Sequence, residues 1–320
     1  MIKVIEVENL TKIYDKFKAV DNISFSVNKG EVFGLLGENG AGKTTTLEMI
    51  EGLRKPSSGQ IKVLGFDVKH HLAEIKERIG VQLQSSAYYK FLRLTEILDL
   101  FGSFYKKHSN FDELFQMVRL EHKKKSYINN LSGGQQQRFS IIASLVNDPE
   151  IVFLDEPTTG LDPLGRRQTW EIISKIKAQG KTIVLTTHYM EEAEILCDRI
   201  AIMEKGKIVA LDQTHKLLEK TKHPFKIAFI LKKEKTGLIN DLKKTCHLDE
   251  FDVKKLPGKE AHYEIKLGNQ ADLNVAVGVL QKENPESLTV GRATLEDVFI
   301  ELTGKSIDQN DSEESEDENV

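Results

Sequence analysis

The apolar positions of the first two thirds of the chain follow the two-residue period of β-strands in some segments and run without interruption in others. Ile2–Val7 alternates apolar and polar residues, and Ile23–Val27 is a second candidate strand. Glu31–Leu36 is a short apolar strand, while Ile151–Leu154 and Thr182–Thr186 are apolar on both faces. Strands that are apolar on both faces are typical of a buried parallel sheet.

Helical spacing appears between these strands. Residues 95–137 look largely helical, and a helix over 135–147 gathers its apolar residues on one face before Asp148-Pro149 ends it. Another helix, 164–178, lies between the last two strands and closes at Gly180. This alternation of strands and helices predicts an α/β domain.

The pattern changes after the α/β domain, which we place at residues 1–212 with a helical subdomain at about 85–150. Residues 213–304 carry elements in the order β-α-β-β-α-β followed by one more helix, which is the ferredoxin-like order and predicts a small α+β domain. The expected elements are strands at 225–231, 251–256, 263–267 and 287–292, and helices at 238–244, 271–282 and 295–302. The remaining stretch, 305–320, is rich in acidic residues, and we expect it to be a disordered tail.

Composition limits the possible functions of the 320-residue chain. The net charge is −4, and residues 308–320 alone hold seven acidic residues and no basic ones, so the rest is only mildly basic and predicts no nucleic-acid partner. The longest uncharged run, 126–137, is mostly polar, and the start lacks the apolar run of a signal peptide, so neither a membrane span nor secretion is expected. Two cysteines, Cys197 and Cys246, are too few for a disulfide framework and favour a reducing compartment.

A glycine-rich loop follows the strand Glu31–Leu36 directly. Gly37–Thr44 matches G-x-x-x-x-G-K-[ST], in which backbone N–H groups converge on phosphate oxygens without a side chain in the way. Lys43 is expected to neutralise the β- and γ-phosphates of a nucleotide, and the Thr44 hydroxyl to bind Mg²⁺. The alternative is an ordinary glycine turn, which the strand–loop–helix context disfavours.

Two carboxylates end the apolar strand at 151–154. Asp155 suits a Mg²⁺ ligand, and Glu156 suits a base that polarises water for attack on phosphorus, because the chain turns at Pro157 and lets the two side chains face different groups. By itself such a strand end fits a helix cap equally well. Together with the phosphate-binding loop it predicts a hydrolytic nucleotide site.

A second glycine-rich helix start, Leu131-Ser132-Gly133-Gly134-Gln135, places a hydroxyl and free N–H groups at the positive end of a helix. At these residues the chain resembles the ATP-binding subunits of ABC transporters, whose signature motif reads LSGGQ. The resemblance implies a P-loop ABC ATPase domain with a helical subdomain, joined here to the small ferredoxin-like domain. It also implies that two chains, a homodimer or a pair of paralogues, hold two ATP molecules head to tail, each capped by the other chain's signature motif.

The resemblance carries further roles to single residues of this chain. Tyr14 resembles the aromatic residue that stacks on adenine, Asp162 the aspartate that crosses the dimer interface, and His188 the histidine that contacts the γ-phosphate. Gln84 resembles the glutamine that touches Mg²⁺ and the attacking water, although Leu83 replaces the usual proline and Gln82 lies nearby. The complete set of implied ATP-binding residues is Tyr14, Gly37, Asn39, Gly40, Gly42, Lys43, Thr44, Thr45, Ser132, Gly133, Gly134, Gln135 and Asp162.

A transporter subunit also needs a membrane partner. Residues 295–304 resemble the terminal segment of exporter ATPases of the antibiotic-resistance branch (the ABC-2 type) and of related lipid exporters. The resemblance implies an ATPase at the cytoplasmic face of the cell membrane, docked on a separate permease. We expect the docking groove to include Ser85–Leu92, with its aromatic residues Tyr88, Tyr89 and Phe91; the alternative is that these aromatic residues belong to the chain's own core.

Other classes of ABC protein fit the motifs less well. Ribosome-acting ABC ATPases normally carry two cassettes in one chain, and DNA-repair relatives place a long coiled coil between the two phosphate motifs, whereas this chain has one set of motifs and only 89 positions from Lys43 to Ser132. A nucleotide-sensing regulator, with the small domain as effector site, remains an alternative to an exporter ATPase.

Overall fold

The computed structural model describes residues 2–83, 88–231, 236–246, 253–255 and 261–304. The chain divides into two compact units, Met1–Thr214 and His215–Val320. The division falls two residues after the boundary expected at 212, because the last strand of the first unit continues to Gln213. The expected acidic tail, 305–320, lies outside the described residues.

The first unit contains an antiparallel sheet of four strands in the order β2-β1-β4-β5. The two N-terminal strands expected from the sequence are parts of one long hairpin, in which Tyr14 pairs with Phe17. Bulges interrupt the register of this hairpin, which is why the alternation of the sequence covers only part of each strand. The strands are β1 (Lys3–Tyr14), β2 (Phe17–Asn28), β4 (Ser58–Val63) and β5 (Phe66–Asp67).

The second sheet of this unit has six strands in the order β10-β9-β3-β8-β7-β6. Strands β9, β3, β8, β7 and β6 are parallel to one another, and only β10 is antiparallel to its neighbour. The three strands that the sequence predicted are fully buried, as expected. The strands are β3 (Val32–Leu36), β6 (Ile79–Gln82), β7 (Ile151–Asp155), β8 (Thr182–Thr187), β9 (Arg199–Glu204) and β10 (Lys207–Gln213).

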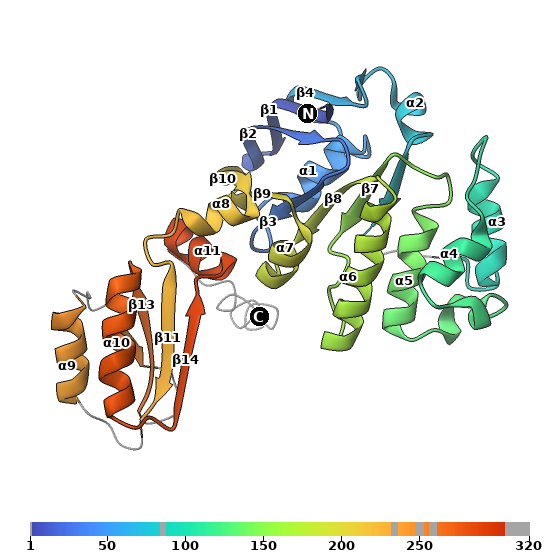
Figure 1. Ribbon diagram of the computed structural model, residues 1–320. Helices are drawn as coiled ribbons and strands as arrows, with labels where there is room; N and C mark the ends of the chain where they lie inside the picture. Colours follow the sequence, from blue (N-terminus) through green and yellow to red (C-terminus); the bar gives the residue numbers. More distant parts are fainter. Residues whose placement is uncertain (1, 84–87, 232–235, 247–252, 256–260, 305–320) are drawn as a thin grey trace, which may run out of the picture. The chain divides into compact units, whose positions relative to one another are not determined.

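Helix α1 (Lys43–Ile50) lies between the two sheets and contacts strands of both (Figure 1). Phe33 and Leu35 of β3 belong to the core that α1 shares with the two sheets, whereas Gly34 points to the other face and meets Cys197 at the end of α7. The parallel sheet is therefore covered on both sides. The other helices around the sheets are α2 (Leu72–Lys76), α6 (Pro163–Ala178) and α7 (Met190–Leu196).

The segment between β6 and β7 is helical but more broken than the sequence suggested. Its last helix ends at Ala143 rather than at 147. Beyond this end, the Asn147 side-chain amide donates to the backbone oxygen of Ile79, at 2.8 Å. Phe139 and Ile142 of the expected apolar face are fully buried. The helices are α3 (Leu94–Gly102), α4 (Phe111–Met117), α5 (Gly133–Ala143) and the 3₁₀ turns Glu121–Lys123 and Ile128–Asn130.

The second unit begins within α8 (Thr214–Glu219) and holds a four-stranded antiparallel sheet in the order β12-β13-β11-β14. The element order β-α-β-β-α-β is the one that the sequence indicated. Helices α9 and α10 pack on the sheet around a core that includes Phe229, Ile265 and Leu280. The elements are β11 (Phe225–Ile230), α9 (Thr236–Thr245), β12 (Val253–Lys255), β13 (His262–Leu267), α10 (Gln270–Lys282), β14 (Ser287–Arg292) and α11 (Leu295–Thr303).

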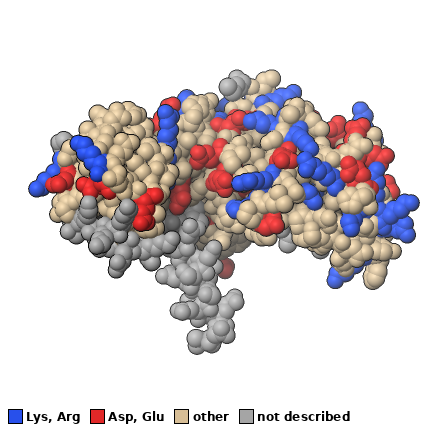
Figure 2. Space-filling view, turned by 60° about the horizontal axis from the view of Figure 1, so that its bottom comes forward, with Lys and Arg blue, Asp and Glu red and all other residues tan. Residues whose placement is uncertain are grey.

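On the face drawn in Figure 2, basic and acidic side chains are interspersed rather than gathered into one patch of a single sign. Such a mixed surface gives no electrostatic footprint of a nucleic acid there. Among the helices that the structure describes, none combines the length and the apolar character needed to cross a bilayer.

Candidate active site

The loop between β3 and α1 requires glycine at two positions because backbone carbonyls approach it closely. A Cβ on Gly37 would lie 2.4 Å from the backbone oxygen of Met203 in β9, and a Cβ on Gly42 would lie 2.4 Å from that of Ala19 in β2. Gly40 adopts a left-handed φ of 78°. The sequence therefore has glycine where the backbone must pass close to its neighbours.

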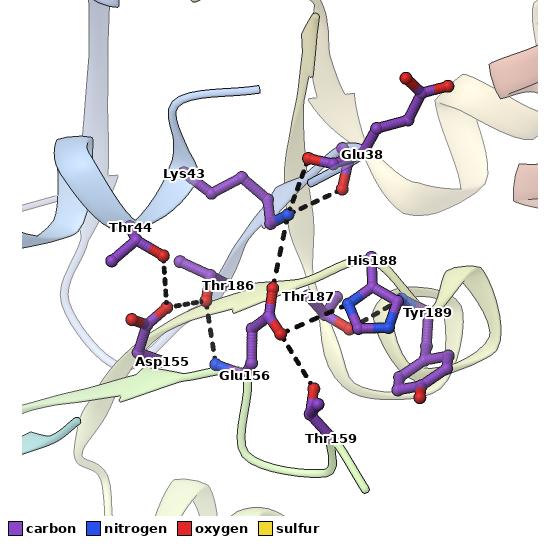
Figure 3. Close-up of polar contacts among 11 residues, drawn as sticks. Glu38, Lys43, Thr44, Asp155, Glu156, Thr159, Thr186, Thr187, His188 and Tyr189 are labelled. Carbon is purple, nitrogen blue, oxygen red and sulfur yellow. Dashed lines mark hydrogen bonds and ion pairs between the residues drawn. The ribbon is translucent and has the colours of Figure 1, made fainter. Parts of the chain in front are cut away.

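Lys43, the first residue of α1, turns its ammonium back over this loop (Figure 3). Its Nζ donates to the backbone oxygens of Gly37, at 2.9 Å, and Glu38, at 3.0 Å, and lies 3.5 Å from Oε1 of Glu156. Burial lowers the pKa of Lys43, and the charge of Glu156 opposes that shift. The ammonium is thus held at the mouth of the loop, where phosphate oxygens would arrive.

The carboxylate of Asp155, at the end of β7, lies between two hydroxyls. Its Oδ1 accepts hydrogen bonds from Thr44, at 3.2 Å, and from Thr186 of β8. Burial raises the pKa of Asp155, and the two hydroxyls partly offset this. A threonine hydroxyl next to a carboxylate is the hard-oxygen donor set that suits Mg²⁺, which also takes waters and phosphate oxygens. Thr44 and Asp155, two of the three residues predicted to hold the metal, therefore fit it; the third, Gln84, lies outside the described residues.

Glu156 follows directly and faces away from Asp155, towards Lys43 and His188 (Figure 3). Its Oε2 accepts a hydrogen bond from Thr159, at 3.0 Å, and lies 3.4 Å from Nδ1 of His188. The residue has a left-handed φ of 48°, and its backbone N–H donates to the hydroxyl of Thr186. Although burial raises the pKa of Glu156, His188 and Lys43 together lower it to about 2. The carboxylate is therefore ionised at neutral pH and aimed at the mouth of the loop.

Ser132 caps the N-terminus of α5 in a reciprocal arrangement. Its Oγ accepts from the backbone N–H of Gln135, at 3.3 Å, and its own N–H donates to the side chain of Gln135, at 3.0 Å. Apart from its chain neighbours and the helix's own backbone, no atom of the described residues lies within 4 Å of the place that a Cβ on Gly133 would take. The helix start is thus fixed in conformation but open on its outer side.

Asp162 caps α6 with its side chain alone, accepting from the N–H of Gly165 at 2.6 Å. The residue before it, Leu161, reaches to within 3.9 Å of the Cβ position of Gly134. The two segments predicted to meet a second chain, at Ser132 and at Asp162, therefore lie beside each other on one unit.

Comparison with known proteins assigns this arrangement to a family. The sequence profile of the ABC transporter family matches residues 20–159. The chain is 34% identical over 315 residues to the linearmycin resistance ATP-binding protein LnrL of Bacillus subtilis, covering 95% of this chain and 99% of that protein. The chain belongs to the ATP-binding proteins of ABC transporters.

Two other comparisons each cover about two thirds of the chain. The Nod factor export ATP-binding protein I of Ralstonia nicotianae is 40% identical over 220 residues, which is 67% of this chain and 68% of that protein. A dimeric ATP-binding cassette solved with ADP and Pi, MJ0796, is 26% identical with a TM-score of 0.60, covering 65% of this chain and 98% of that one. The ABC cassette fold expected from the sequence is thereby confirmed.

The structure places three of the four remaining positions implied by the ABC resemblance. Tyr14 stands at the end of β1 and is 37% exposed, Asn39 is exposed in the loop, and Thr45 is partly buried in the first turn of α1. Gln84 lies outside the described residues. Gln82, two positions before it, is buried at the end of β6 and donates to the backbone oxygen of Leu83, at 2.7 Å.

The aromatic residues expected to dock a permease divide into two groups. Tyr88 packs inward, with its ring 5.4 Å from that of Phe139 and 6.1 Å from that of Phe101, so it serves the cassette's own core. Tyr89 is 65% exposed and Phe91 is 92% exposed. Residues 85–87 of this stretch lie outside the described part of the chain.

Sequence reasoning missed the two threonines that hold the carboxylates. Thr186 bonds both Asp155 and the N–H of Glu156, and Thr159 bonds the Glu156 side chain. The signal for Thr186 was present: it is one of two threonines that end an apolar strand, and parallel pairing sets it beside Asp155. Thr159 offered no comparable signal, because its role depends on the turn after Pro157.

Proposed function

We propose that this chain is the ATP-hydrolysing subunit of an ABC exporter that works through a separate permease. The cluster of Lys43, at the start of α1, with Glu156 and His188, which follow β7 and β8, carries the proposal, because it joins a phosphate-binding cation to an ionised base. The names of its relatives, Nod factor export and linearmycin resistance proteins, favour export over the regulator alternative.

In this proposal the tasks of hydrolysis are divided among the side chains of the site. Lys43 and the loop N–H groups bind the β- and γ-phosphates of ATP, and His188 contacts the γ-phosphate. Glu156 takes the proton of the attacking water. Thr44 and Asp155 would hold Mg²⁺, with Gln84 as a further ligand that also orients the water. Bound Mg²⁺ supplies positive charge that stabilises the phosphate oxygens.

The open helix start at Ser132 and Gly133 gives the cassette a second phosphate contact for a neighbouring chain. A helix N-terminus with free N–H groups attracts anions, and nothing crowds it in the described residues around Gly133. We propose that two cassettes, identical or paralogous, close head to tail over two ATP molecules, with Asp162 crossing the interface. The dimeric state of the ADP- and Pi-bound relative supports this arrangement.

The same proposal places the chain at the cytoplasmic face of the cell membrane, bound to its permease through the exposed Tyr89 and Phe91. Closing of the dimer on ATP and reopening after hydrolysis would then move the permease, since ATP favours only the closed state that completes its contacts. The cargo is selected by the permease.

The substitution Glu156→Gln tests the proposal. It should keep ATP binding, lower hydrolysis roughly 100- to 10,000-fold because the base is lost, and accumulate an ATP-bound dimer in size-exclusion chromatography. Glu150→Gln is the matched control, since Glu150 pairs with Arg78 on the surface. Hydrolysis at the wild-type rate in Glu156→Gln would reject Glu156 as the base.

Export is tested separately by purification from detergent-solubilised membranes. The tagged chain should bring down a polytopic membrane protein in a fixed ratio. Hydrolysis without any such partner would favour a soluble ABC-type ATPase or a regulator.

A further inference from the structure

Two cations lie against the ring of Tyr14. Lys12 places its Nζ 4.9 Å from the ring centroid, and Arg54 places its guanidinium carbon 5.5 Å from it. Both distances are within the range of cation–π attraction. The ring nevertheless keeps exposed surface, because Tyr14 is 37% exposed.

Each cation is itself held by a second contact. The Nε of Arg54 donates to Oε2 of Glu48 at 2.5 Å, and the Nζ of Lys12 donates to the backbone oxygen of Lys55 at 2.9 Å. Glu48 belongs to α1, the helix that begins with Lys43. The cations are therefore fixed relative to the phosphate-binding loop and not only to the tyrosine.

Backbone contacts tie the same two segments together. The N–H of Ile13 donates to the hydroxyl of Ser57, at 3.0 Å, and the N–H of Ser57 donates to the oxygen of Thr11, at 2.9 Å. The end of β1 is thus joined to residues 54–58, which connect α1 to β4. Arg54 therefore links Tyr14, on an exposed strand end, to the helix that carries Lys43.

We propose that Arg54 is a positioning residue for the nucleotide base: with Lys12 it holds the Tyr14 ring at a fixed place relative to Lys43, ready to stack on a purine. The inference rests on the proposed function and on the ABC resemblance, which implies that Tyr14 stacks on the adenine of ATP. Arg54 acts through the ring, so its contribution belongs to base binding. It does not belong to phosphate binding or to the chemistry at Glu156.

Because Arg54 contributes to base binding and not to phosphate binding, its replacement should affect ATP and a compound without a base differently. Replacing Arg54 by Met keeps the length of the side chain but frees the ring, so ATP should bind about three- to fivefold more weakly. The KM for ATP should rise by a similar factor with little change in kcat. Inorganic tripolyphosphate, which has the phosphates but no base, should bind Arg54→Met and the wild-type chain equally well.

Arg78 offers a closely matched control. It makes the same pair of contacts, an ion pair with Glu150 at 2.6 Å and a cation–π contact with Phe66 at 5.8 Å, on side chains of nearly equal exposure, 38% for Arg78 and 37% for Arg54. Titration calorimetry of the full chain with Mg-ATP and with Mg-tripolyphosphate should show weaker ATP binding in Arg54→Met only. Arg54→Lys, which restores a cation, should recover part of the affinity.

A double-mutant cycle with Tyr14→Ala completes the test. Arg54→Met should have no further effect on ATP affinity once the ring is gone. Equal losses in the two Arg→Met variants, an equal loss for tripolyphosphate, or a full effect of Arg54→Met in the Tyr14→Ala chain would overturn the inference. Failure of the wild-type chain to bind either compound would instead overturn the proposed function.

Discussion

At the scale of single residues, two neighbouring carboxylates are given opposite properties by their surroundings. Burial raises the pKa of Asp155, whereas His188 and Lys43 outweigh burial and lower that of Glu156 to about 2. Such divergence assigns different roles to a pair of acids. Asp155 is prepared to gain a cation, and Glu156 remains an ionised acceptor for a proton.

Lys43→Ala should remove the main cation of the loop. The cost to transition-state stabilisation should be about 3 kcal/mol, which lowers kcat/KM by roughly two orders of magnitude. Nucleotide binding should weaken as well, because the side chain contacts phosphates in the ground state. Steady-state ATPase kinetics and nucleotide titration measure the two effects. Lys62→Ala, at an exposed position of β4, is the control; a wild-type rate for Lys43→Ala would remove the residue from the site.

At the scale of elements, a capped helix N-terminus stabilises its helix, and in one case it also belongs to a motif proposed to bind ATP. Ser132 caps α5, and Asn110 caps α4 in the same helical segment, accepting from the N–H of Asp112 at 3.0 Å. A cap contributes about 1 kcal/mol to stability. Only the first of these two caps belongs to the motif proposed to meet ATP on a second chain.

Comparing Ser132→Ala with Asn110→Ala separates capping from nucleotide contact. Both should destabilise the chain by about 1 kcal/mol in denaturant unfolding. Each substitution is then combined with Glu156→Gln. In this background only Ser132→Ala should reduce the fraction of ATP-dependent dimer in size-exclusion chromatography. Equal dimerisation of the two variants would argue against a role for Ser132 across the interface.

Helix α11 of the second unit is anchored by a buried acid. Asp297 pairs with Lys266 at 2.8 Å and with Lys226 at 3.4 Å, and accepts from the N–H of Thr294. Although burial raises its pKa, these partners lower it to about 2. Because the folded pKa lies below the ordinary value of 3.8, this contribution to stability is complete above about pH 4 and is lost as the pH falls towards 2.

Asp297→Asn should therefore destabilise the second unit by about 2 kcal/mol at pH 7. The difference from wild type should shrink as the pH is lowered from 4 to 2. Hydrogen exchange of peptides within 225–304, read by mass spectrometry, measures it. The exposed neighbour in the same helical turn, Glu296, gives the control Glu296→Gln. A loss that does not change with pH would contradict the ion-pair explanation.

The sequence predicted the elements whose own residues show a clear pattern and missed those whose residues do not. The apolar strands at 151–155 and 182–187 carry their own signal, but β6 does not, because Gly80 stands in a strand of four residues. Glycine is required there, since a Cβ would lie 1.9 Å from the oxygen of Ser144. The contact that demands it comes from a distant helix end, which no local pattern reveals.

The sequence analysis missed the hairpin of β9 and β10, although Gly206 marks its turn in the sequence. Lys205 and Gly206 both have positive φ, as a tight two-residue turn between paired strands requires. For the site, motif spacing identified Lys43, Asp155 and Glu156. The supporting hydroxyls and the cations around Tyr14 depend on tertiary packing and could not be read from spacing.

At the scale of the whole molecule, the proposed function requires that the conformational change driven by ATP hydrolysis is transmitted to a membrane partner. Tyr89→Glu should weaken binding of the permease by about tenfold or more, because a charge would be buried without a partner in an apolar contact. ATP binding by the isolated chain should be unchanged. Phe104→Glu is the control, since Phe104 is 68% exposed and lies outside the docking stretch. Co-purification and permease-stimulated ATPase rates measure the effect; normal coupling of Tyr89→Glu would reject this docking surface.

The contacts of Gly37 and Gly42 have a consequence beyond fitting a phosphate. Gly37 abuts a strand of the six-stranded sheet, and Gly42 abuts a strand of the antiparallel sheet. The phosphate-binding loop therefore lies between two layers of the cassette, and its backbone is in close contact with both. A methyl group at either position would force the neighbouring strand to move away. The distance between the two layers therefore also determines the conformation of the loop that binds a triphosphate.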